Sequence, residues 1–293
     1  MLRLGTRGSA LALAQAGQVR DRLVALGQEV ELIVIRTSGD ESQPAPEVAD
    51  KERFVREIEQ ALLADRIDMA VHSAKDVPGT LPDGLAIVGV PERADARDAI
   101  CGAASLDELA AGAAVGTASV RRRSQLLAAR PDLDVREVRG NVDTRLRKLA
   151  EGGYDALVLA AAGLARLGRD DGTAVDAGTM LPAPGQGCLA LEGREGDTAV
   201  SELAVELTDF AALVALTAER ALVARLDATC DTPVGAHARL EGDSVVLDGW
   251  AGAPDGSAWV RDTETGATTE PAALGVRVGE RMLAAGARQV LDG

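Results

Sequence analysis

Aromatic side chains are nearly absent from this chain of 293 residues, of which they make up 2%. Platforms on which bases or sugars stack are therefore not expected. A basic surplus is lacking as well, since 31 lysine and arginine residues against 46 acidic ones leave a formal charge of −15. Sequence-independent binding of nucleic acid depends on positive charge, so that function is excluded. The core must be built from the aliphatic residues of the 46% hydrophobic fraction.

Cysteine and histidine are scarce too. The chain contains Cys101, Cys188 and Cys230, together with His72 and His237. An odd number of widely spaced cysteines is typical of a reducing compartment, and no ligand set has metal-binding spacing. The sequence has no secretory signal pattern and no apolar run of about 18 residues, the length of a membrane span. We expect a cytoplasmic protein without metal or membrane attachment and, because no exposed apolar seam is evident, a monomer.

The first part of the chain predicts an α/β fold. Short apolar runs of buried-strand type occur at 29–36, 67–71, 85–90 and 155–160. Amphipathic helical segments, such as 53–66, lie between them. This alternation is typical of a doubly wound sheet.

One helix is predicted to begin at the capping residue Ser9 and to end before Gly27. Its buried face is expected to carry Leu13, Ala16, Val19, Leu23 and Leu26.

Breaks in composition at 91–98 and 181–187 indicate boundaries between domains. The acidic, proline-bearing segment 38–50 is typical of a mobile surface loop. The C-terminal part predicts a small α+β domain, with helices at 212–226 and near 271–286 and strands at 244–252 and 257–264.

Lysine is rare, because three of the 31 basic residues are lysine and 28 are arginine. Arginine forms two-pronged contacts with carboxylates that lysine cannot copy. Three predicted strand-to-helix junctions combine arginine with a small or polar capping residue: GTRGSA (5–10), GTASVRRRSQL (116–126) and VRGNVDTRLRKL (138–149). Such junctions gather at the carboxyl edge of an open sheet, where helix N-termini attract anions. A single arginine at a helix start is more often a solvated charge.

The three junctions together favour a ligand with several carboxylates. No glycine-rich phosphate-binding motif is present, so a nucleotide is not the expected anion. The stretch IDMAVHSAKDVPGTLPDG (67–84) places Ser73, Lys75 and Asp76 directly after a strand, where a sheet presents catalytic groups. For His72, a structural role and a functional one are equally compatible with the spacing.

Six blocks in a fixed order resemble the signature blocks of the porphobilinogen deaminase (hydroxymethylbilane synthase) family. They are VHSAKDVP, GTASVRRRSQL, VRGNVDTRLRKL, LAAAGLARLG, LPAPGQG and CDTPVGA. The C-terminal GAPDGS (252–257) fits as well. One block alone would be a weak signal, whereas the ordered set is specific.

The resemblance implies an enzyme of tetrapyrrole biosynthesis with three domains. Two are doubly wound α/β domains of the periplasmic-binding-protein type, comprising 1–92 with 187–208, and 93–186; residues 209–293 form a small α+β domain. Such an enzyme is a transferase that deaminates four porphobilinogen molecules and joins them head to tail on a dipyrromethane cofactor. It releases hydroxymethylbilane and ammonia.

The resemblance also assigns roles to residues by position. Asp76 matches the catalytic carboxylate and Cys230 the cysteine that holds the cofactor through a thioether. Positions matching cofactor-binding residues are Lys75, Ser119, Arg121, Arg122, Arg139 and Arg145. Positions expected to bind substrate are Arg7, Ser9, Ser73, Arg166, Gln186 and Lys51.

Two departures from the family pattern occur. The flanks of Lys51 read ADKERF (49–54) instead of a glycine-rich run, and Thr229 stands where a glycine commonly precedes the cofactor cysteine. Cys101 and Cys188 have apolar neighbours and are expected in the core.

Two other classes of protein compete with this interpretation. A non-catalytic two-lobed protein that binds small carboxylates would share the fold but would need no cysteine in a third domain. A cysteine-nucleophile hydrolase would need a histidine base near the thiol.

Overall fold

The computed structural model describes residues 1–35, 50–229 and 231–292, with the side chains of 50–54 left aside. Cys230, the side chain of Lys51 and most of the predicted loop 38–50 lie outside the described residues. The chain divides into two compact units, Met1–Arg93 with Cys188–Leu213, and Ala94–Gly187 with Val214–Gly293. Helix α7 (Phe210–Leu226) begins in the first unit and continues into the second.

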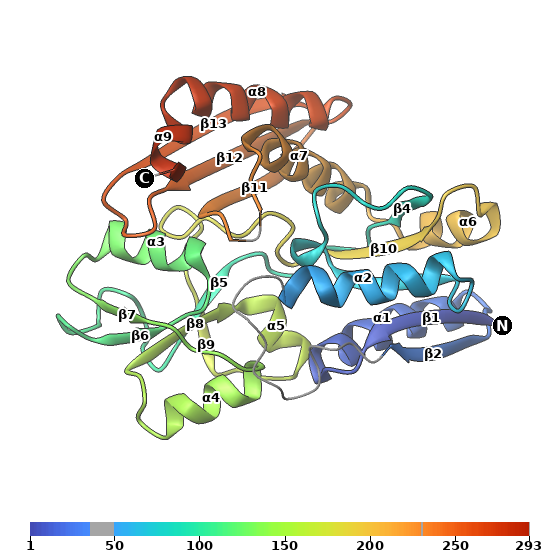
Figure 1. Cartoon of the computed structure of the whole chain (residues 1–293), viewed down its shortest axis with the longest axis horizontal. Coiled ribbons are helices and arrows are strands. Elements are labelled where there is room, and N and C mark those ends of the chain that lie inside the picture. The colour runs from blue at the N-terminus through green and yellow to red at the C-terminus, as the bar shows by residue number, and fades with distance from the viewer. Residues whose placement is uncertain (36–49, 230, 293) are drawn as a thin grey trace. The chain divides into compact units, whose positions relative to one another are not determined.

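The first unit is built on a five-stranded sheet in the order β2-β1-β3-β10-β4 (Figure 1). Its strands are β1 (Leu2–Arg7), β2 (Val30–Ile35), β3 (Met69–Ser73), β4 (Leu85–Gly89) and β10 (Leu189–Arg194). Its helices are α1 (Ala10–Ala25), α2 (Asp50–Leu63), the short 3-10 turn η1 (Ala74–Asp76) and α6 (Thr198–Leu207). Strand β10 runs antiparallel to both of its neighbours, β3 and β4. Helices α1 and α6 contribute to the core on one face of the sheet, and α2 covers the other.

The two ends of helix α1 are determined by its local sequence. The Ser9 side chain accepts a hydrogen bond from the Ala12 amide at 3.3 Å, and Gly27 adopts φ 82° just past the helix end. Both predicted boundaries are therefore confirmed. The predicted buried face is correct for three of its five residues, Ala16, Val19 and Leu23.

The other two predicted core residues of α1 are exposed, Leu13 by 38% and Leu26 by 45%. At about 100° per residue, Leu13 lies on the flank of the buried stripe. Leu26 is the C-cap residue, beyond the last regular turn. Gln15 is buried on this helix instead.

The second unit contains a sheet of the same pattern, in the order β7-β6-β8-β5-β9. Its strands are β5 (Asp98–Cys101), β6 (Ala114–Gly116), β7 (Asp134–Arg136), β8 (Ala156–Ala160) and β9 (Gly172–Ala174). Helices α3 (Val120–Ala129), α4 (Val142–Ala150) and α5 (Ala161–Arg166) accompany it. Strand β5 is antiparallel to both neighbours, as β10 is in the first unit. In each sheet the antiparallel strand is the one with which the chain enters or re-enters that unit.

A three-stranded antiparallel sheet completes the second unit. It consists of β11 (Val234–Glu241), β12 (Ser244–Gly252) and β13 (Trp259–Ala267). Helices α7 and α8 (Pro271–Ala284) share an apolar core with this sheet, and α9 (Ala287–Asp292) ends the chain (Figure 1). The predicted α+β character of the C-terminal part is confirmed.

Candidate active site

In the first unit, the parallel pairing of β1 with β3 brings the predicted site residues to one edge of the sheet. Arg7 is the last residue of β1, and Ser9 caps the helix that follows. Ser73 ends β3, and Lys75 and Asp76 belong to η1 directly after it. All five side chains are partly exposed. This carboxyl edge of the sheet therefore presents two cations, two hydroxyls and one carboxylate.

Asp76 lies in the short turn η1, and backbone hydrogen bonds hold this turn in place. The Ala74 amide donates to the Cys188 carbonyl at 3.0 Å, and the Val77 amide donates to the Ala74 carbonyl at 3.3 Å. These two bonds fix the turn between β3 and the start of β10. A carboxylate on a fixed, partly exposed turn is suited to stabilising positive charge or moving a proton.

In the second unit, strands β6, β7 and β8 are parallel, so the segments that follow them share one edge. We call this edge the arginine edge; it comprises Ser119, Arg121, Arg122, Arg139, Arg145 and Arg166. Ser119 caps α3 by accepting from the Arg122 amide at 3.4 Å, and Asn141 caps α4 by accepting from the Thr144 amide at 2.9 Å. The predicted strand-to-helix junctions at both places are confirmed.

Two residues of the arginine edge are buried. The side chains of Arg121 and Arg122 are only 4% and 7% exposed. Both donate to the buried carboxylate of Asp98, the last residue of the predicted domain boundary 91–98. Gln186, expected to bind substrate, is buried as well and donates to the Asp98 carboxylate at 2.9 Å and to the Ala96 carbonyl at 2.7 Å.

Arg145 lies at the start of α4 and contacts backbone rather than a carboxylate among the described residues. Among the described residues no carboxylate lies within ion-pair distance of it, although its Nε donates to the Gly140 carbonyl at 2.7 Å. Burial lowers the pKa of Arg145, and the neighbouring Arg122 lowers it further. Two guanidinium groups that repel each other in this way form a site that an anionic ligand would stabilise.

The remaining arginines differ in environment. Arg139 is exposed and pairs with Glu137 at 2.6 Å. Arg166, at the end of α5, donates to the Gly187 carbonyl at 2.8 Å.

The loop around Cys230 is described only through its neighbours. The Thr229 amide donates to the Thr232 hydroxyl at 2.9 Å, and the Asp231 amide donates to the Thr229 hydroxyl at 3.3 Å. Thr229 and Asp231 are exposed. The threonine that replaces the family's glycine thus contributes a hydroxyl to this turn. Cys101 and Cys188 are fully buried, which confirms their predicted place in the core.

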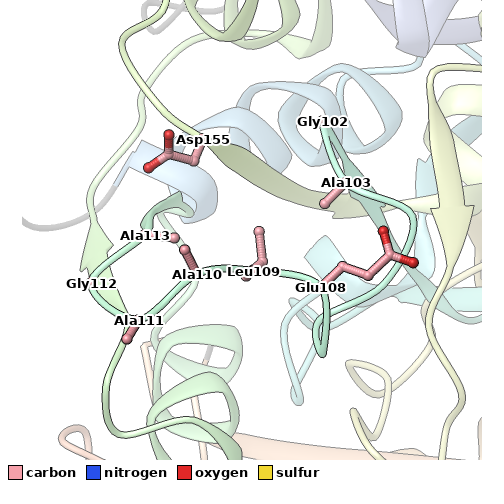
Figure 2. Close-up of a pocket in the computed structure, with 9 residues that line it drawn as sticks. All are labelled: Gly102, Ala103, Glu108, Leu109, Ala110, Ala111, Gly112, Ala113 and Asp155. Atoms are coloured by element: carbon pink, nitrogen blue, oxygen red, sulfur yellow. The ribbon is translucent and has the colours of Figure 1, made fainter.

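Figure 2 shows a hollow on the second unit, and none of the residues that line it is a predicted site residue. The segment Glu108–Ala113 and Asp155 contribute to its lining, and Asp155 stands just before β8. This is the amino end of the parallel strands, opposite the arginine edge. The Asp155 carboxylate accepts from the Ala114 amide at 2.7 Å and so serves the start of β6.

The described part of the chain contains no group of His, Cys, Asp or Glu side chains suited to holding a metal ion. In the same residues, no helix has both the length and the apolar character needed to cross a membrane.

Comparison with known proteins identifies the family. Residues 2–202 match the model described as porphobilinogen deaminase, dipyromethane cofactor binding domain, and residues 213–284 match the porphobilinogen deaminase C-terminal domain. The porphobilinogen deaminase of Roseiflexus castenholzii is 48% identical over 100% of this chain and 99% of its own length. That of Deinococcus radiodurans is 45% identical over 99% and 97%.

Solved structures of lower similarity include a periplasmic substrate-binding protein of an ABC transporter from Coxiella burnetii. It is 16% identical, covers 73% of this chain and 94% of its own, and has a TM-score of 0.44. The fold is α/β, with two five-stranded mixed sheets accompanied by helices and a small C-terminal α+β part. From its sequence matches over the full length, the chain belongs to the porphobilinogen deaminase family.

Proposed function

We propose that the chain is a hydroxymethylbilane synthase. It deaminates four porphobilinogen molecules and joins them head to tail on a covalently held dipyrromethane, releasing hydroxymethylbilane and ammonia. The observation that carries this proposal is the full-length match to porphobilinogen deaminases, at 48% identity with the Roseiflexus castenholzii relative. The arginine edge supports it, because every pyrrole unit brings two carboxylates.

Asp76 is the proposed catalytic residue. Loss of ammonia from porphobilinogen leaves an electron-poor, cationic pyrrole, which a fixed carboxylate beside the pyrrole N–H stabilises. The same carboxylate can accept and return a proton. The backbone hydrogen bonds of η1 hold the main chain that carries Asp76 in place.

The remaining site residues are proposed to bind carboxylate side chains. On the first unit these are Arg7, Ser9, Ser73 and Lys75. On the second unit they are Ser119, Arg121, Arg122, Arg139, Arg145, Arg166 and Gln186. Each charge-assisted hydrogen bond contributes roughly 1.5 to 3 kcal/mol, so a few of them hold a polyanion against a chain whose formal charge is −15. Lys51 is proposed for substrate from its sequence position alone.

The residues present fit a dipyrromethane. Arg122 and Arg145 repel each other without a bound anion, and an acetate or propionate group would relieve that repulsion. Cys230 is the proposed attachment point, and the exposed polar residues on either side of it suit a tether. The bound dipyrromethane supplies the free pyrrole end to which the first substrate unit is joined.

We further propose three domains, 1–92 with 187–208, 93–186, and 209–293. The three sheets, each with its own core, support this division. We also propose a monomer located in the cytoplasm, and the odd number of widely spaced cysteines supports a reducing compartment. The alternative of a non-catalytic carboxylate-binding protein is not favoured, because the full-length relatives are deaminases.

Intact-mass measurement tests the proposed function. The purified protein should exceed the mass of its sequence by one dipyrromethane, and Cys230→Ser should remove that increment. Cys188→Ser is the matched control and should retain it. A parent protein with the bare mass of the chain, and no activity after porphobilinogen is supplied, would contradict the proposal.

A further inference from the structure

Asp98 lies at the arginine edge because it is the first residue of β5, which starts at this edge. Strand β5 runs antiparallel to β8, so its first residue, Asp98, lies opposite Ala160 at the carboxyl end of β8. Strands β6, β7, β8 and β9 all end at this edge. The sheet topology therefore places the Asp98 carboxylate among the arginines of this edge, and the Asp98 side chain is fully buried.

The contacts of Asp98 occupy both carboxylate oxygens. Its Oδ2 accepts from Arg121 Nη1 at 2.7 Å, and its Oδ1 accepts from Arg121 Nη2 at 3.2 Å. The same Oδ1 also accepts from Arg122 Nε at 2.9 Å and from Gln186 Nε2 at 2.9 Å. Burial by itself would raise the pKa of Asp98, but the two arginines hold it far below its ordinary value. Asp98 is thus ionised and serves as the shared counterion of two adjacent guanidinium groups.

The two arginines are not equivalent. Arg121 Nη1 also donates to the Leu181 carbonyl at 2.7 Å, so its guanidinium is held by Asp98 and by the backbone at Leu181. Arg122 donates to the Val158 carbonyl at 3.0 Å, and its charge is the one that lowers the pKa of Arg145. Asp98 neutralises one of the three positive charges of Arg121, Arg122 and Arg145. The remaining positive charge is located at Arg122 and Arg145.

We propose that Asp98 is a positioning residue for ligand binding: it retains Arg121 as an internal brace and holds Arg122 in place to bind, together with Arg145, a carboxylate of the ligand. Gln186 supports this arrangement by bonding both Asp98 and the Ala96 carbonyl. For Arg121 and Gln186, an indirect role through Asp98 then replaces the direct contact with the ligand's carboxylates that their sequence positions suggest. This inference rests on the proposed function in that the ligand is a dipyrromethane or the growing chain.

Asp98→Asn tests the positioning role, with the covalently held dipyrromethane as readout. The variant leaves two buried arginines without their counterion, so the fraction of folded protein that carries the cofactor mass should fall about tenfold. Thermal unfolding of the same sample reports the folded fraction. Asp98→Asn protein that is less stable but carries the cofactor as fully as the parent would overturn the positioning role.

Two double variants with the same net charge separate the brace from the ligand contact. Asp98→Asn with Arg121→Gln removes the counterion and the brace together, and should restore at least half of the parent's cofactor content. Asp98→Asn with Arg122→Gln should stay without cofactor. Equal cofactor content in the two double variants, or more in the second, would overturn the distinction between the arginines. The double variants decide this point even if Asp98→Asn alone does not fold.

The cofactor content of the parent protein separates a failure of the proposed function from a failure of the role proposed for Asp98. A parent without dipyrromethane contradicts the proposed function, whereas a loaded parent with fully loaded Asp98→Asn contradicts only the role of Asp98.

Discussion

The imidazole of His72 and the carboxylate of Glu192 are paired inside the first unit, with Nε2 and Oε2 2.8 Å apart and side chains 4% and 0% exposed. His72 lies on β3 shortly before Asp76, and Glu192 lies on the antiparallel neighbour β10. Of the two roles that the sequence left open for His72, the buried pairing supports the structural one. Glu59 of α2 is also buried, and its pKa responds to both residues.

This buried cluster should make the stability of the protein depend on pH. Burial raises the pKa of Glu59 and Glu192 raises it further, while His72 and Arg56 lower it. Because the folded-state pKa is above the ordinary 4.5, the stability contributed by the protonated carboxyl is fully present below that pH and is lost as pH rises through the raised value. Glu59→Gln, which cannot ionise, should flatten this part of the melting-temperature profile.

The measurement is the melting temperature of parent and variant from pH 4.5 upward, starting at the ordinary pKa. Glu206→Gln, at an exposed position of α6 in the same unit, makes the same charge change and should leave the slope unaltered. Parallel profiles for Glu59→Gln and the parent would show that Glu59 does not titrate in this range.

Thiol reactivity should separate the three cysteines. Cys101 and Cys188 are fully buried, and burial raises the pKa of Cys101 to about 11, so neither thiol is reactive in the folded protein. With Cys230 bonded to the cofactor, an alkylating reagent should modify no thiol in the folded protein and only these two after unfolding. Counting added groups by mass checks this. A third reactive cysteine in the unfolded parent would contradict a permanent thioether.

Much of the fold could be predicted because its signals are local. Ser9 and Ser119 are capping residues at helix starts, and Gly27 adopts the positive φ that ends α1. The exposed Leu13 shows that hydrophobic periodicity does not predict the edges of a buried helix face, because leucine occurs both on that face and beside it. Which part of a stripe is covered depends on the sheet beneath it, which lies far away in sequence.

The site residues that follow parallel strands could be predicted from the sequence, whereas the one that begins an antiparallel strand could not. Arg122 and Arg145 follow strands that end at one edge, which the strand-to-helix pattern indicates. Asp98 starts β5, and its place beside Arg121 depends on the direction of that strand. The sequence PERADARD (91–98) gives no sign of this direction, and its charges are those of an ordinary linker. A single aspartate before a short apolar run was the only available signal.

Asp76→Asn should separate chemistry from binding. The change keeps the size of the side chain but removes its charge, so turnover should fall by about 100- to 10,000-fold, the usual contribution of general acid–base catalysis. Folding and cofactor mass should persist, because the turn is held by the Ala74 and Val77 amides and not by the Asp76 side chain. The initial rate of hydroxymethylbilane formation is the measurement. Asp83→Asn, at an exposed position of the same unit, is the matched control.

Arg145→Gln should weaken carboxylate binding without destabilising the empty protein. The Cys230→Ser background removes the cofactor, and citrate then serves as a probe that raises the melting temperature by binding the folded state. Losing one charge-assisted contact, worth roughly 1.5 to 3 kcal/mol, should weaken citrate binding about 10- to 100-fold. Without citrate, the variant should melt no lower than its background, because the repulsion from Arg122 is gone.

Arg147 provides the control on the same helix. It is exposed and pairs with Glu151 one turn away at 3.2 Å, so Arg147→Gln removes the same charge from outside the proposed site. Its effect on citrate binding should be small, because exposed charges are screened by solvent and salt. If Arg145→Gln and Arg147→Gln weakened citrate binding equally, the response would reflect net charge alone, and Arg145 would not contact the carboxylate.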